Sequence, residues 1–185
     1  MGVGSRVGFI SQLTSVRFRF SLLMRKNQVK KIYIPHQATS KEIGFGVGSI
    51  FLAGPTPRDD ETKSWRPEFI EALRNTGIDC SVLIPECEHQ TWLGNYEKQC
   101  QWEYEHLQRS TAIIFWVPRN LVSMPAFTTN VEFGYWLKSS KTFYGRPDGA
   151  PKTRYLDWMY QKEHKSKPST TMDELVRTVS RWLLG

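Results

Sequence analysis

The sequence lacks several features that would each point to a particular class of protein. It has only three cysteines, Cys80, Cys87 and Cys100, which are too few and too scattered for a disulfide framework or a zinc site. We interpret them as reduced cytosolic thiols. No apolar run approaches the roughly 18 residues of a membrane-spanning helix, and there are no repeats. No cluster of metal ligands is visible, so we expect neither a metal nor another cofactor.

Acidic side chains are absent from the first 41 residues, which carry eight basic ones. The remaining residues carry 17 basic and 18 acidic side chains, so the net charge of +7 resides entirely in the N-terminal part. A nucleic-acid-binding protein would be expected to have its basic surface on the folded domain. We therefore expect a small-molecule ligand, with neither nucleic acid nor a membrane as partner.

Residues 1–28 form a basic extension without a clear core pattern. Arg- and Ser-containing, acid-free segments are typical of organellar transit peptides, but a disordered tail or a non-native start has the same composition. We expect a cytoplasmic protein, or an organellar one if this segment is a transit peptide. With 39% hydrophobic and 13% aromatic residues, residues 29–185 are predicted to form a single α/β domain.

Hydrophobic periodicity predicts strands that alternate with helices. This order favours parallel β-α-β units with right-handed crossovers. The strands are expected at 30–35, as an edge strand, and at 49–54, 80–84, 112–117 and 141–144; the helices are expected at 65–75, 97–108, 129–139, 153–162 and 172–184. Helical spacing predicts that the residues facing the core are Trp65, Phe69, Ala72 and Leu73; Cys100, Tyr104 and Leu107; Tyr155, Leu156, Met159 and Tyr160; and Leu175, Val179 and Trp182.

The stretch 124–136 places Glu132 near the start of a helix that follows a buried strand. Open α/β sheets bind ligands at such positions. One interpretation is a capping box, in which Thr129 caps the helix and Glu132 bonds back to it; the change Glu132→Gln would then cost little. The other is a nucleophile that the helix dipole keeps ionised and that attacks a sugar carbon.

A second candidate segment follows the strand at 49–54. Gly54 and Pro55 form a turn that lets the backbone approach a ligand closely. Thr56 adds a hydroxyl, and Arg58 adds a fork of donors suited to phosphate or carboxylate. A Gly-Pro turn after a strand also occurs for purely structural reasons.

Several ordered motifs resemble the nucleoside 2-deoxyribosyltransferase-like family. They are IFLAGPTPR at 50–58, SWRPE at 64–68, VLIPE at 82–86, QWE at 101–103, FWVPR at 115–119 and FTTNVEFG at 127–134, with GRP at 145–147 and YLD at 155–157. The resemblance covers roughly residues 30–162. It implies a flavodoxin-like, Rossmann-like three-layer α/β sandwich with a mostly parallel sheet, and a homo-oligomer with sites near subunit contacts.

The resemblance also implies cleavage of the N-glycosidic bond of a deoxynucleoside or deoxynucleotide by a glutamate nucleophile, which Glu132 matches in its Glu-x-Gly context. Relatives usually carry an aspartate near the departing base, where this chain has Thr111. A threonine cannot act as an acid. Activation of the base would then come from Glu86, Glu103 or Asp59, or the protein binds a nucleotide without turning it over.

The leading hypothesis is therefore an N-glycosidase or deoxyribosyltransferase acting on a nucleoside or nucleotide, and the alternative is a nucleotide-binding sensor or interaction module. Hydrolysis and transfer differ only in whether water or a second base attacks the intermediate. Trp116 could equally be core, Arg119 a surface pair and Thr128 the start of the helix. The candidate catalytic residues are Glu132 and Asn130; the candidate substrate-binding residues are Gly54, Pro55, Thr56, Arg58, Trp116, Pro118, Arg119, Phe127, Thr128 and Thr129.

Overall fold

The computed structural model describes residues 29–33, 48–86 and 95–185. The predicted extension at 1–28 and Cys87 lie outside these residues. Strands and helices alternate, as predicted. Their order is β1 (Lys30–Tyr33), β2 (Ser49–Ala53), α2 (Arg66–Asn75), β3 (Ser81–Ile84), α3 (Tyr96–Arg109), β4 (Ala112–Trp116), α4 (Phe127–Trp136), β5 (Thr142–Gly145), α5 (Arg154–His164) and α6 (Met172–Leu184).

The described strands form one five-stranded sheet in the order β1-β3-β2-β4-β5. Every neighbouring pair is parallel, and β1 is an edge strand that pairs only with β3, as its sequence predicts. Counted from β2, the order β3-β2-β4-β5 is that of a flavodoxin-like sheet, with β1 added at one edge. The chain moves from β2 to β3 on one side and then to β4 on the other. The carboxyl ends of β2 and β4 therefore flank the topological switch point, where such sheets bind ligands.

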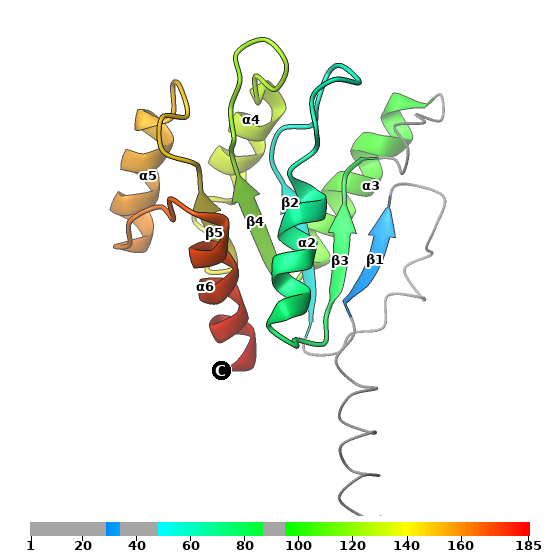
Figure 1. The fold of residues 1–185 in the computed structure, drawn as a ribbon, viewed down its shortest axis with the longest axis vertical. Coiled ribbons are helices and arrows are strands. Elements are labelled where there is room, and N and C mark those ends of the chain that lie inside the picture. The colour runs from blue at the N-terminus through cyan, green and yellow to red at the C-terminus, as the bar shows by residue number, and fades with distance from the viewer. Residues whose placement is uncertain (1–28, 34–47, 87–94) are drawn as a thin grey trace, which may run out of the picture.

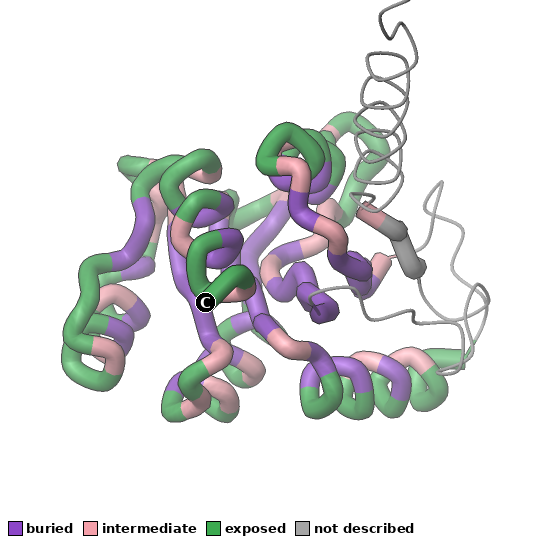
Figure 2. The backbone as a smooth tube through the Cα atoms, turned by 90° about the horizontal axis from the view of Figure 1, so that it is seen from below, coloured by how far each residue is buried: buried purple, intermediate pink, exposed green. Residues whose placement is uncertain are grey.

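Two hydrophobic clusters fill the two faces of the sheet. Along β2 the side chains alternate: Phe51 belongs to the cluster under α3, α4 and α5, whereas Ile50 and Leu52 belong to the cluster under α2 and α6. A strand covered by helices on both faces is apolar at every position, and β2 is buried throughout. Helices lie on both sides of the sheet in the ribbon (Figure 1), and burial follows the strands and the inner helix faces (Figure 2). The fold is thus the predicted three-layer α/β sandwich.

Some of the predicted core faces are wrong. On α3, Cys100 is exposed and Tyr104 is 51% exposed; the buried residues are Trp102, His106 and Leu107. Both sets recur at helical spacing, so periodicity could not decide which stripe meets the sheet. Tyr155 on α5 and Trp182 on α6, expected inside, are 67% and 43% exposed. No helix in the described ranges is long and apolar enough to cross a membrane.

Candidate active site

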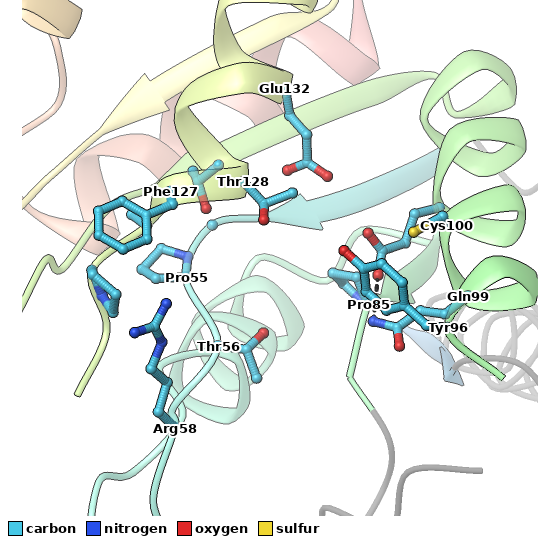
Figure 3. Close-up of a pocket in the computed structure, with 15 residues that line it drawn as sticks. Pro55, Thr56, Arg58, Pro85, Tyr96, Gln99, Cys100, Phe127, Thr128 and Glu132 are labelled. Atoms are coloured by element: carbon cyan, nitrogen blue, oxygen red, sulfur yellow. Dashed lines mark hydrogen bonds between the residues drawn. The ribbon is translucent and has the colours of Figure 1, made fainter. Parts of the chain in front are cut away.

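A cavity of about 220 Å³ opens at the switch point, beyond the carboxyl ends of β2 and β4. Its walls come from four parts of the chain: the loop after β2, Pro85 after β3, the first two turns of α3, and the start of α4 with the residues before it (Figure 3). The lining residues are Gly54, Pro55, Thr56, Arg58, Pro85, Tyr96, Gln99, Cys100, Glu103, Pro125, Ala126, Phe127, Thr128, Thr129 and Glu132.

Glu132 lies in the second turn of α4 and not at its start. The helix begins at Phe127, and its N-cap is Ala126 in the left-handed conformation (φ 63°, ψ 36°), without a side-chain cap. Thr129 is a buried residue within the helix. The predicted capping box at Thr129 is therefore wrong, and so is the expectation that the helix terminus keeps Glu132 ionised, since that effect fades beyond the first turn. The carboxyl group of Glu132 lies at the cavity (Figure 3).

Two carboxyl groups from different helices meet in this cavity, Glu132 from α4 and Glu103 from α3. Burial, together with the nearby charge of Glu103, raises the pKa of Glu132 to about 8, against the opposing influence of Arg66. Burial also raises the pKa of Glu103, although a hydrogen bond from Gln99 Nε2 to Glu103 Oε1 (2.8 Å) and the charge of Arg66 oppose the shift. Two like charges in a poorly solvated site disfavour each other, so burial and mutual repulsion both favour the protonated form of Glu132.

The structure brings most of the predicted site residues to this cavity. Glu132 shares it with Gly54, Pro55, Thr56, Arg58, Phe127, Thr128 and Thr129. Phe127 is 67% exposed, and the guanidinium carbon of Arg58 lies 5.4 Å from the centre of its ring. Arg58 is also fixed through its backbone, whose N–H donates to Ser123 O (3.0 Å). The loops after β2 and β4 thus meet at the mouth of the cavity.

Four predicted residues, Trp116, Pro118, Arg119 and Asn130, are not brought to the cavity lining. Trp116 is 5% exposed and belongs to the core cluster under α2 and α6, because its side chain leaves β4 on that face. The Arg119 guanidinium is buried away from the cavity, where Nη1 donates to Lys152 O (2.7 Å) and Nη2 donates to Asn130 Oδ1. The Asn130 carboxamide is therefore engaged with Arg119.

Thr111 lies at the opposite end of the sheet from Glu132. Its backbone N–H donates to Ser49 O (2.9 Å), and its Oγ1 accepts from Ser49 N (3.0 Å), at the amino ends of β2 and β4. The interpretation that Thr111 occupies the place of an acid beside the departing base is therefore wrong. A threonine at this position removes no acid from the cavity.

Only one of the three alternative acids lines the cavity, and it is Glu103. Glu86 Oε2 forms an ion pair with Arg66 Nη1 at 2.8 Å. Asp59 is exposed, and its Oδ1 accepts from Thr62 N (2.8 Å) within a turn. A hydrogen bond from Thr62 lowers the pKa of Asp59, which does not suit a proton donor. Glu103 is thus the carboxyl group placed to act with Glu132.

Sequence reasoning missed most of the α3 wall of the cavity. Tyr96, Gln99, Cys100 and Glu103 recur at spacings of three, one and three, so they lie on one helix face, and all four line the cavity. That periodicity is the available signal, but the same spacing also predicts a core-facing stripe through Cys100 and Tyr104, and this prediction is wrong. Within the described residues, no group of three His, Cys, Asp or Glu side chains could hold a metal ion.

The cavity with its two carboxyl groups lies at the switch point of a flavodoxin-like sheet, where such sheets bind ligands. The model of the nucleoside 2-deoxyribosyltransferase-like family matches residues 47–150, more than half of the chain and the part that contains every cavity residue. The chain belongs to this family. No curated protein matches the sequence.

Proposed function

We propose that the protein cleaves the N-glycosidic bond of a nucleoside or nucleotide, with Glu132 as nucleophile and Glu103 as the acid that protonates the leaving base. The observation that carries this proposal is the placement of the two carboxyl groups on separate walls of one cavity at the switch point. Family membership favours a deoxyribosyl substrate.

The reaction balances with these two groups alone. The Glu132 carboxylate attacks C1′ of the sugar, the C1′–N bond breaks, and its electron pair leaves with the base, which takes a proton from Glu103. The glycosyl-enzyme ester then reacts at C1′ with water or with a second base, while Glu103 accepts the proton of that nucleophile. The first acceptor gives hydrolysis and the second gives transfer.

The raised pKa values suit the two roles in different ways. Glu103 holds its proton to higher pH than an exposed glutamate does, because burial disfavours its charged form. Glu132 must lose its proton to act, and its pKa of about 8 makes the nucleophile the minor form in the free protein at pH 7. Turnover requires an ionised Glu132 and a protonated Glu103 together, so kcat/KM should first rise and then fall with pH.

The mouth of the cavity suits an anionic group on the substrate. Arg58 extends over Phe127, Thr56 contributes a hydroxyl from the loop after β2, and Thr128 contributes one from the first turn of α4. The first N–H groups of α4 have no side-chain cap, and such groups favour anions. These features favour a 5′-phosphate at this end, with Tyr96, 74% exposed on the opposite wall, as an aromatic surface for the base.

Arg58→Ala is expected to raise the KM for a nucleoside 5′-monophosphate about tenfold, the effect of losing one charge-assisted contact. The KM for the corresponding nucleoside should remain nearly unchanged. The control is Arg74→Ala, since Arg74 is an exposed α2 residue paired with Glu71. Equal losses with both substrates would show that Arg58 supports the loop and does not bind phosphate.

The raised pKa of Glu132 also favours a second candidate function. A protein in which the nucleophile is mostly protonated at neutral pH could use the same cavity to bind a nucleotide without efficient turnover. This nucleotide-binding sensor or interaction module would need no acid, so Glu103→Gln would leave its affinity for ligand nearly unchanged.

Nucleobase release, followed by chromatography, separates the two functions. The panel contains nucleosides, deoxynucleosides, their 5′-monophosphates and NAD, with and without an acceptor base, and wild type is compared with Glu132→Ala. The proposed activity predicts release from at least one deoxyribosyl substrate by wild type and none by the variant. Absence of release from every member at pH 7 and pH 8.5 would refute the enzyme and leave the binding module.

A further inference from the structure

Arg66 is a charged residue that the fold buries completely. Its side chain is 1% exposed, although it lies at the first position of α2, where arginine is ordinarily solvated. An unpaired buried charge would be strongly destabilising, and the guanidinium is fully engaged. It donates from Nε to Leu52 O (3.1 Å), from Nη2 to Gly54 O (2.9 Å), and from Nη1 to Pro55 O (3.4 Å), Thr56 Oγ1 (3.2 Å) and Glu86 Oε2 (2.8 Å).

These hydrogen bonds fix one wall of the cavity. Gly54, Pro55 and Thr56 line it, and Arg66 binds all three. The same loop also packs closely against β4. Gly54 has a φ of 139°, and a Cβ there would lie 2.3 Å from the backbone oxygen of Trp116. The position of the loop after β2 therefore depends on its hydrogen bonds with Arg66 and on its close packing against β4.

The positive charge of Arg66 also acts on both members of the carboxyl pair, Glu103 and Glu132. Three carboxyl groups from different elements interact with it: Glu86 after β3, Glu103 from α3 and Glu132 from α4. Its charge lowers the pKa values of both Glu103 and Glu132 and so opposes the effect of burial. The Tyr96 phenol on α3 also interacts with both glutamates.

We propose that Arg66 is the positioning residue of this site: its hydrogen bonds hold the cavity wall at Gly54–Thr56, and its guanidinium supplies a buried positive charge directly behind that wall. Its catalytic consequence rests on the proposed function. Its effect on the ionisation of Glu132 does not, and the experiment measures the two separately.

The direct measurement is the titration midpoint of the Glu132 carboxyl carbon in the full-length protein, followed by carbon NMR and assigned by its loss in Glu132→Gln. Arg66→Met should raise this midpoint by about one pH unit, as expected for loss of a nearby opposite charge. Glu86→Gln should lower it, since it removes a negative charge from the same group of side chains while Arg66 stays. Arg74→Met, on the same helix but exposed, should leave the midpoint unchanged.

Activity gives the second readout. The acid limb of the kcat/KM profile should move with the NMR midpoint, upward in Arg66→Met and downward in Glu86→Gln, and Arg66→Lys should restore part of the wild-type position. If the midpoints move but no substrate is turned over, the proposed function fails and the role of Arg66 in ionisation stands. Unchanged midpoints would overturn that role whatever the activity. If Arg66→Met does not fold, Glu86→Gln decides alone.

Discussion

At pH 8, Glu132→Gln is expected to unfold at a higher temperature than wild type while losing at least about a thousandfold of its base-release activity, as is usual for a catalytic nucleophile. The loss of activity is expected because the amide of glutamine cannot form the glycosyl ester. The gain in stability is expected because the wild type, at that pH, carries an ionised carboxyl group in a poorly solvated cavity beside Glu103. A site that reduces stability for the sake of function is a common compromise.

The gain in stability of Glu132→Gln over wild type should increase as pH rises. In the unfolded chain the Glu132 carboxyl group titrates near its ordinary value of 4.5, and in the folded chain near 8. Below pH 4.5 both states are protonated and the residue has no linked effect. Between 4.5 and 8 the folded state binds more protons than the unfolded state, so the free energy of unfolding falls as pH rises. Above 8 the penalty is complete.

Thermal unfolding of wild type and Glu132→Gln between pH 4.5 and 8.5 tests this expectation. One pKa unit corresponds to about 1.4 kcal/mol, and partial solvation of the side chain reduces the full shift to a gain on the order of 2 kcal/mol, or roughly 5 °C for a chain of this length. The difference should vanish near pH 4.5. Glu163→Gln, an exposed change on α5, should show no such trend. A Glu132→Gln protein that is less stable than wild type at pH 8 would contradict a buried, raised carboxyl group.

The sequence was sufficient to predict the fold because buried parallel strands leave strong local signals. β2 and β4 are short apolar runs that end at Gly54 and near Pro118, and each lies within one residue of its predicted end. The two-sided burial of β2 makes it continuously apolar, which distinguishes it from the polar turns on either side. Element type and order followed from such runs, whereas the flavodoxin-like topology was implied by the resemblance to the family.

The same short pattern gave a correct and an incorrect helix start. At Thr171-x-x-Glu174 the pattern does cap a helix: Thr171 is extended (φ −125°, ψ 153°), its side chain accepts from Glu174 N, and Glu174 Oε2 accepts from the N–H of Thr170, the residue before the cap. Thr129-x-x-Glu132 matches the pattern equally well, but the chain enters α4 through the left-handed Ala126. No residue type there requires that conformation, so the earlier helix start was not readable from the sequence.

The α3 wall was missed for a different reason. Tyr96, Cys100 and Tyr104 form one stripe and Trp102 and Leu107 form part of another, and both contain large apolar residues. Which stripe meets the sheet depends on packing: Trp102 packs against Phe51 at a ring separation of 6.0 Å and stacks on His106 at 4.1 Å. Helical spacing alone does not contain this information, so the placement of Glu103 at the cavity is visible only in the structure.

Glu103→Gln provides the sharpest test of how that wall takes part in the reaction. If Glu103 protonates the departing base, the variant should lose about a hundredfold in kcat/KM with a natural deoxynucleoside, the lower range for loss of a general acid. It should lose little with 4-nitrophenyl 2-deoxyriboside, because that leaving group departs without a proton. Glutamine keeps an acceptor for Gln99 Nε2, which in wild type donates to Glu103 Oε1, so the helix should be undisturbed.

The same variant should shift the acid limb of the remaining activity to lower pH. The charge of Glu103 contributes to the raised pKa of Glu132, so its removal lets Glu132 ionise more readily, and the aryl substrate reports this shift without interference from the lost acid. Glu105→Gln, two residues along α3 and exposed, should change neither leaving-group dependence nor pH profile. Equal losses with both substrates would assign Glu103 to binding or structure. A limb that does not move would show that the two carboxyl groups titrate independently, and the case for a coupled acid and nucleophile in one cavity would fail.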